Sequence, residues 1–333
     1  MTGEKSSELR AQGSDQLVQS SEQSSISEKT SSNNRTTSHS TLHTPHLIRL
    51  VIYLIISFGI PFLLIFIYIA NFGFTVENDW YGPLASFAMF CPAIANIITR
   101  LVTKEGTENL CLKIKFKGNI RYFLIALIFP IICGIITALI ASLTLFPENS
   151  LSNMFQHFRY NDFAVLILYV VSVTIAAVFM GFGEEFGWRA YMMPKLEKLM
   201  SPSAALIVGG IIWGLWHAPL VACGHNFGND YPAYPWLGII LMCISCVCIG
   251  VYLTALTKAS HSVLPAALAH IAINNMCGAI SGTMLSYIDI PESELMKISS
   301  EFSYSLLFMI TMSVSALAAG IAIFFAQKIS VKK

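Results

Sequence analysis

The sequence predicts an all-α membrane protein, a polytopic bundle of about eight transmembrane helices. Hydrophobic residues make up 55% of the chain and charged residues only 12%, which leaves few polar side chains to cover a soluble domain. The mean hydropathy is +0.64. Apolar residues are also gathered into blocks of roughly 20, the length that a helix needs to cross a bilayer core of about 30 Å.

Residues 1–46 differ from the rest of the chain and are predicted to be a disordered cytoplasmic tail. They are rich in Ser and Thr and poor in apolar side chains. Such a composition buries too little surface to offset the entropy lost on ordering. We therefore begin the membrane domain at residue 47 and extend it over residues 47–330.

Eight apolar blocks follow the tail, and each is predicted to be a membrane span because it is close to bilayer length. Their ranges are about 47–70, 81–102, 121–146, 163–183, 203–222, 235–257, 262–282 and 303–327.

The loop charges predict the orientation of the spans. The connection over residues 100–121 carries six Lys and Arg side chains, whereas the connection over 71–80 carries none. Cytoplasmic loops are enriched in Lys and Arg, so 100–121 is assigned to the cytoplasm. Alternation through eight spans then places both the N- and C-terminus in the cytoplasm.

The net charge and the positions of the cysteines limit the kinds of partner that the protein is expected to bind. The formal net charge is +1 and the basic residues form no stripe, so nucleic acid is not an expected partner. The eight cysteines lie mostly in apolar runs, where a free thiol packs as a small hydrophobe, and no disulfide framework is expected. Membrane lipid and a membrane-associated molecule are the expected partners.

Polar side chains in and beside three of the predicted spans are candidates for a functional site. They are Glu184, Glu185, Arg189, His217, His270 and Asn274. An ionised side chain at the centre of a membrane helix costs about 2.5–3.5 kcal/mol unless it faces protein or water. Hydrogen bonds between membrane helices return only about 0.6–2 kcal/mol. Helix packing alone is therefore a poor explanation for the whole set.

Helical spacing separates the two carboxylates. Glu185 and Arg189 are four residues apart and can pair on one face of a helix. Glu184 points about 100° away and shares its face with Trp188. One carboxylate is therefore balanced by a cation on its own helix, and the other is free.

The set suits hydrolysis of a peptide bond. A Glu and a His that face one water can activate it. His270 and Asn274, four residues apart on one span, can project into the same cavity and donate hydrogen bonds to an oxyanion. No Gly-x-Ser-x-Gly elbow and no His-Glu-x-x-His motif is present, so serine acyl transfer and zincin chemistry lack their signatures.

These motifs resemble those of the CPBP family of intramembrane proteases, also called the Abi family. The family contains CAAX prenyl endopeptidases and bacterial relatives linked to bacteriocin processing or immunity. Its first motif, Glu-Glu-x-x-x-Arg, matches Glu184, Glu185 and Arg189. Its second, Phe-x-x-x-His, matches His217 but has Trp213 in place of Phe.

The third family motif, His-x-x-x-Asn, matches His270 and Asn274. The resemblance covers about residues 160–285, which we take as the catalytic core, and the layout of about eight spans is similar to the family's fold. It implies an intramembrane endopeptidase that cleaves a membrane-associated or lipidated protein or peptide.

The resemblance also implies a role for each motif residue. Glu184 would activate water together with His217, and His270 with Asn274 would form the oxyanion hole. Glu185 and Arg189 would shape the site.

Three alternatives stay open. No cofactor is favoured, but the family has also been described as metalloproteases, and Zn²⁺ would then be held by Glu184, His217 and His270. A non-catalytic immunity or scaffold protein could use the same groups to bind a peptide. A transporter could use them as a proton relay. The sequence specifies no substrate, since apolar side chains suit a prenyl group, a membrane helix or lipid equally well.

Overall fold

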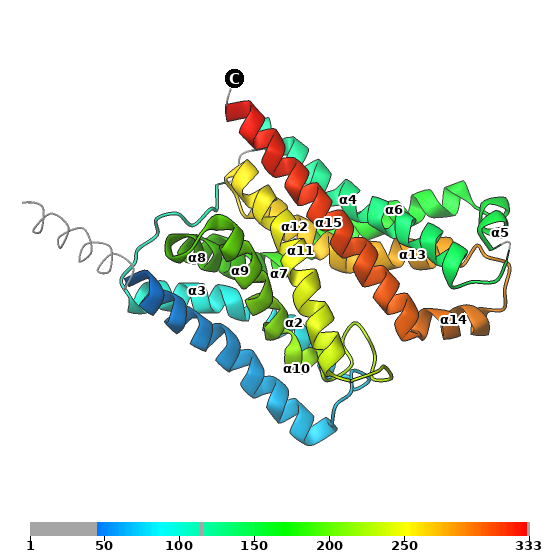
Figure 1. Cartoon of the computed structure of the whole chain (residues 1–333), viewed down its shortest axis with the longest axis horizontal. Coiled ribbons are helices and arrows are strands. Elements are labelled where there is room, and N and C mark those ends of the chain that lie inside the picture. The colour runs from blue at the N-terminus through cyan, green and yellow to red at the C-terminus, as the bar shows by residue number, and fades with distance from the viewer. Residues whose placement is uncertain (1–44, 114–115, 149, 332–333) are drawn as a thin grey trace, which may run out of the picture. The chain divides into compact units, whose positions relative to one another are not determined.

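The computed structural model describes residues 45–113, 116–148 and 150–331 (Figure 1). The predicted disordered tail falls on residues 1–44, outside the described residues, apart from the last two residues of its range. The chain divides into a unit that ends at Ile48 and a unit of Arg49–Lys333. The described residues form helices, turns and loops without a strand, which confirms the all-α class.

Five helical stretches of the described chain are long and apolar enough to cross a membrane. They are Pro45–Phe72, Tyr81–Val102, Lys117–Thr144, Trp236–Ser260 and Phe302–Ile329. All five coincide within a few residues with predicted spans. A sixth is added if Ser150–Gln156 and Tyr160–Ala176, bent by 92°, count as one span. The protein is therefore an integral membrane protein with several spans.

The other three predicted spans are shorter or divided helices, which is why the count falls below eight. The range 163–183 is shared by α6 (Tyr160–Ala176) and α7 (Val178–Gly187). The range 203–222 contains α9 (Pro202–Trp216) and the short α10 (Ala218–Val221). The range 262–282 contains α12 (Leu264–Ala272), the π-helix η2 (Ile273–Cys277) and α13 (Gly278–Leu285). These irregular segments carry the polar motifs.

The remaining elements complete the bundle. They are α2 (Tyr81–Ala88), α3 (Cys91–Val102), α4 (Phe116–Thr144), α5 (Ser150–Gln156), the π-helix η1 (Trp188–Met192), α8 (Met193–Leu199), α11 (Trp236–Ser260), α14 (Glu292–Ser300) and α15 (Phe302–Val331). Within the described chain, π-helical turns occur at η1, which contains Arg189 of the first motif, and at η2, which contains Asn274 of the third. Such turns widen a helix locally and are frequent at functional sites.

Helix α7 lies between α3 and α12, and its glycines make this possible (Figure 1). An ideal Cβ built at Gly187 would lie 2.4 Å from Cβ of Pro92 on α3. A Cβ at Gly181 would lie 2.3 Å from the carbonyl oxygen of Ala267 on α12. Only glycine allows these backbones so close, and the approach brings the first motif within reach of the third.

Candidate active site

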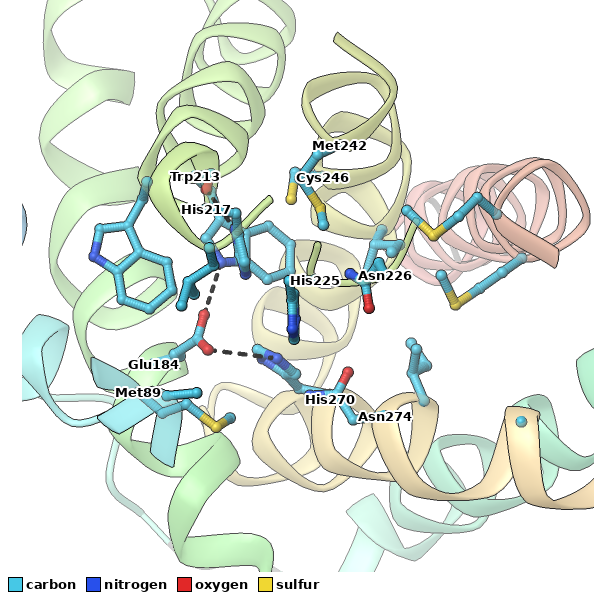
Figure 2. A pocket seen from close by; sticks show the side chains of 18 of the residues that line it. Met89, Glu184, Trp213, His217, His225, Asn226, Met242, Cys246, His270 and Asn274 are labelled. Carbon is cyan, nitrogen blue, oxygen red and sulfur yellow. Dashed lines mark hydrogen bonds and ion pairs between the residues drawn. The ribbon is translucent and has the colours of Figure 1, made fainter. Parts of the chain in front are cut away.

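A cavity of about 440 Å³ collects residues from all three motifs (Figure 2). Glu184 reaches it from α7, His217 from the C-terminal end of α9, and His270 and Asn274 from α12 and η2. Its apolar wall includes Met89, Met242, Cys246, Ile249, Met309 and Met312. Four of the six predicted site residues therefore line one cavity.

Two indoles hold one oxygen of the Glu184 carboxylate. Nε1–H of Trp213 donates to Oε2 at 2.7 Å, and Nε1–H of Trp188 donates to the same atom at 3.2 Å. The other oxygen, Oε1, lies 3.8 Å from Nε2 of His270. The predicted placement of Trp188 beside Glu184 is confirmed. The Glu184 side chain is 3% exposed, and Oε1 is the oxygen left to receive a proton.

Glu185 and Arg189 lie behind the cavity and do not line it. Nη1 of Arg189 donates to Oε1 of Glu185 at 3.0 Å, which confirms the predicted pair. The same oxygen lies 2.7 Å from Nδ1 of His270. Oε2 of Glu185 is buried without a hydrogen-bond partner among the described residues. Glu185 thus fixes the orientation of the His270 ring from outside the cavity.

A backbone carbonyl fixes the tautomer of His217. Nδ1 lies 2.9 Å from the carbonyl oxygen of Trp213, which can only accept a hydrogen bond. Nδ1 therefore carries the proton, and in the neutral ring Nε2 keeps its lone pair. That nitrogen is the one able to accept a proton from water.

The Trp213 side chain touches several groups of the site. The centroid of its ring lies 4.2 Å from the guanidinium carbon of Arg189. The same ring meets the His270 and His217 rings edge-on, with centroids 5.4 and 5.8 Å away. Together with its bond to Glu184, these contacts make Trp213 the packing centre of the motifs, whereas the sequence analysis treated it only as an aromatic replacement.

The sequence analysis also missed His225, which lines the cavity from the loop between α10 and α11 (Figure 2). Burial lowers the pKa of His225 to about 4, so its ring is neutral near pH 7. It lies outside the three family motifs and in a range predicted to be an external loop. The available signal was its neighbour Gly224, because glycine favours a tight turn. In the structure Gly224 has a φ of +99°.

The predicted zinc ligands do not form a recognisable metal-binding group. No group of three or more His, Cys, Asp or Glu side chains in the described residues is placed to hold a metal ion. Nδ1 of His270 is occupied by Glu185, Nδ1 of His217 by a carbonyl, and Oε2 of Glu184 by two indoles. The zinc alternative stays a prediction, and no step below passes through a metal.

Residues 166–276 match the family model described as type II CAAX prenyl endopeptidase Rce1-like. This range contains all six predicted site residues and falls within the predicted core of 160–285. Residues 166–276 therefore resemble the CPBP family, and we call them the CPBP segment. The resemblance inferred from the three motifs is confirmed.

Three curated relatives are similar to part of this chain. Lysostaphin resistance protein A of Staphylococcus epidermidis is 31% identical over 149 residues, 44% of this chain and 35% of that protein. The protein of the same name from Staphylococcus haemolyticus is 28% identical over 149 residues, 44% of this chain and 37% of its own. CAAX prenyl protease 2 of Methanococcus maripaludis is 29% identical over 119 residues, 35% of this chain and 41% of its own. This chain thus matches less than half the length of each of these relatives.

Proposed function

We propose that this protein is an intramembrane endopeptidase that hydrolyses a peptide bond of a membrane-associated or lipidated protein or peptide. The observation that carries the proposal is the single cavity lined by Glu184, His217, His270 and Asn274. Two of these side chains suit proton acceptance and two suit stabilisation of an oxyanion. The CPBP segment supports the same reaction class.

Glu184 and His217 are proposed to activate the attacking water. Both indole N–H groups bind Oε2 of Glu184, so Oε1 is available as the proton acceptor. Nε2 of His217 can accept a hydrogen bond from the same water and orient it. The water oxygen would bond to the carbonyl carbon while its proton passes to Glu184. When the C–N bond breaks, that proton would move to the leaving amine.

His270 and Asn274 are proposed to stabilise the oxyanion that forms when the carbonyl is attacked. The Asn274 amide can donate from its position on the cavity wall. His270 already donates Nδ1–H to Glu185, so it can donate through Nε2 only as an imidazolium. Glu185 and Arg189 would hold this ring in place and thereby shape the site.

A prenylated or otherwise lipidated substrate fits the apolar wall of the cavity. Methionine side chains on α11 and α15 face the polar groups across the space (Figure 2). Thioether chains adapt to flexible apolar ligands. The name of the Methanococcus maripaludis relative, CAAX prenyl protease 2, supports testing farnesylated peptides first.

The test is cleavage of a mixed library of quenched peptides, farnesylated and unmodified, by the purified protein in mild detergent. Glu184→Gln keeps the shape of the side chain and removes the proton acceptor, so cleavage should fall at least 100-fold. Glu294→Gln, on the exposed surface of α14, is the matched control and should cleave as the parent does. Full activity of folded Glu184→Gln would refute the assignment of the base.

Two further outcomes separate the alternatives. Loss of cleavage on chelation, restored by adding Zn²⁺ back, would favour the zinc-dependent version of the reaction. Saturable peptide binding without cleavage, in a protein shown to be folded, would favour the non-catalytic immunity or scaffold protein.

A further inference from the structure

A second cavity, of about 780 Å³, is lined by Arg189. We call it the Arg189 cavity. It is lined by residues of the loop over 107–113, the start of α8 and the C-terminal end of α11. None of Glu184, His217, His270 and Asn274 lines it. The proposed peptidase chemistry therefore leaves this space without a role.

The guanidinium of Arg189 has unused hydrogen-bond donors at this cavity. Its side chain is 3% exposed, and among the described residues its one hydrogen bond runs from Nη1 to Glu185. An arginine carries five N–H donors in a fixed fork, and buried donors are nearly always satisfied. Arg189 lines the Arg189 cavity, so a ligand there can accept from the donors that the protein leaves free.

The other polar groups of the cavity point to an anion. Thr254 lines it, and the Thr254 hydroxyl is buried without a hydrogen-bond partner in the described part of the chain. Lys113 and Lys258 add two further cations, against the single carboxylate of Glu197, which pairs with Lys258. A planar guanidinium with a hydroxyl and an ammonium nearby suits an oxyanion with several acceptor oxygens.

The position of the cavity favours phosphate chemistry. Its walls come from the C-terminal end of the long apolar helix α11 and from the basic loop before α4, where a membrane span meets water. Phosphate groups, either of lipids or of soluble molecules, are concentrated at that boundary. We propose that the Arg189 cavity binds a phosphate-bearing anion, held by Arg189 and Thr254 with Lys258 at its rim.

This site would communicate with the candidate active site through two hydrogen bonds. Arg189 binds Glu185, and Glu185 binds His270, which lines the first cavity. A phosphate on the free side of Arg189 would compete for the positive charge that now faces Glu185. The inference goes beyond peptide cleavage and does not depend on it.

Binding is tested on the full chain in two arms. In detergent, inorganic phosphate is titrated by calorimetry against chloride at equal ionic strength. In nanodiscs, bound lipid is measured by native mass spectrometry as phosphatidylglycerol replaces phosphatidylcholine. Saturable binding in the first arm identifies a soluble phosphate, and binding confined to the second identifies a lipid headgroup. Either result supports the proposal.

Thr254→Val supplies the decisive variant because it keeps the shape of the side chain and removes the hydroxyl. Affinity should fall about ten-fold, the loss of one charge-assisted hydrogen bond. Without ligand, the variant should melt no lower than the parent, because the hydroxyl it loses has no partner. Lys258→Gln should also weaken binding, and Lys297→Gln on exposed α14 should not. Absence of saturable binding in both arms, or equal affinity of the parent and Thr254→Val, would overturn the proposal.

Discussion

Trp213 is the residue at which this chain departs from the usual family motif, and its indole nitrogen has a specific partner. A phenylalanine there would keep the aromatic packing but could not donate to Oε2 of Glu184, now 2.7 Å away. The carboxylate would then be held by Trp188 alone, at 3.2 Å. Trp213 therefore orients the proposed base in a way that a phenylalanine cannot.

Trp213→Phe is expected to lower kcat/KM about ten-fold, because one hydrogen bond to a charged group is worth about 1.5–3 kcal/mol. The measurement is a set of initial rates on the best peptide of the library. Trp216→Phe is the matched control, since its Nε1–H donates to the carbonyl oxygen of Ser57 rather than to Glu184. The idea fails if both variants lose activity in proportion to a loss of folded protein.

The spacing of residues along the sequence predicted the contacts within one helix. It did not predict the contacts between different helices. The pairs Glu185–Arg189 and Glu184–Trp188 follow from a separation of four residues. The bond from Trp213 to Glu184 spans 29 positions in the sequence and depends on how α7 and α9 pack. The contact between His270 and Glu185 spans 85 positions. No local pattern encodes either of these distances.

At the scale of helices, the close approach of α7 to α3 depends on Gly187. Gly187→Ala would place a methyl group 2.4 Å from Cβ of Pro92, and overpacking of this kind costs about 1–3 kcal/mol. Thermal melts in detergent should show a lower melting temperature.

Gly59→Ala is the matched control for this prediction. Its Cβ meets nothing within 4 Å, so alanine should be neutral or slightly stabilising in that helix. Equal melting temperatures for Gly187→Ala and the parent would show that the two helices can separate at no cost.

A partly buried ion pair connects the loop after α3 to α8. Glu105 accepts hydrogen bonds from Lys195 and from the Tyr191 hydroxyl. Burial raises the pKa of Glu105, but the hydrogen bonds from Lys195 and Tyr191 outweigh it, so the pKa lies below its ordinary value of 4.5. A carboxyl with a lowered folded-state pKa stabilises the protein above 4.5 and loses that contribution as the pH falls through the folded value.

Glu105→Gln should therefore lower stability near pH 7 by about 1–3 kcal/mol. The difference in melting temperature from the parent should stay constant down to about pH 5 and shrink at more acidic pH. Melts of both proteins between pH 7 and pH 3.5 provide the measurement. A difference that does not change over this range would contradict the assigned cause.

At the scale of the whole chain, the number of spans decides where the termini lie. Eight or six spans put both termini on the same side of the membrane, whereas five put them on opposite sides. We predict that both are cytoplasmic, from the basic loop over 100–121. Labelling of a cysteine introduced at either end with an impermeant maleimide, in intact and in opened cells, measures this. Protection of both ends in intact cells is the expected result.

The sequence analysis identified the fold class because composition and block length are properties of single segments. It overestimated the number of long spans because the helices that carry the motifs are broken where the chemistry lies. Ala177 separates α6 from α7, and π-helical turns begin directly after Gly187 and Ala272. Hydropathy is averaged over a window of residues that is longer than such a break. A divided helix and a continuous helix therefore give the same hydropathy profile.

The glycine-lined helix α7 has a consequence for how the protein is made. Its ten residues include Glu184 and Glu185. The Glu185 carboxylate contacts Arg189 and also His270, which lies 85 positions later in the sequence. A ribosome that adds about 5–20 residues per second needs about 4–17 s to make the intervening 85 residues. During that interval Glu185 can pair with Arg189 but not with His270. The site is therefore completed only after α12 has been made.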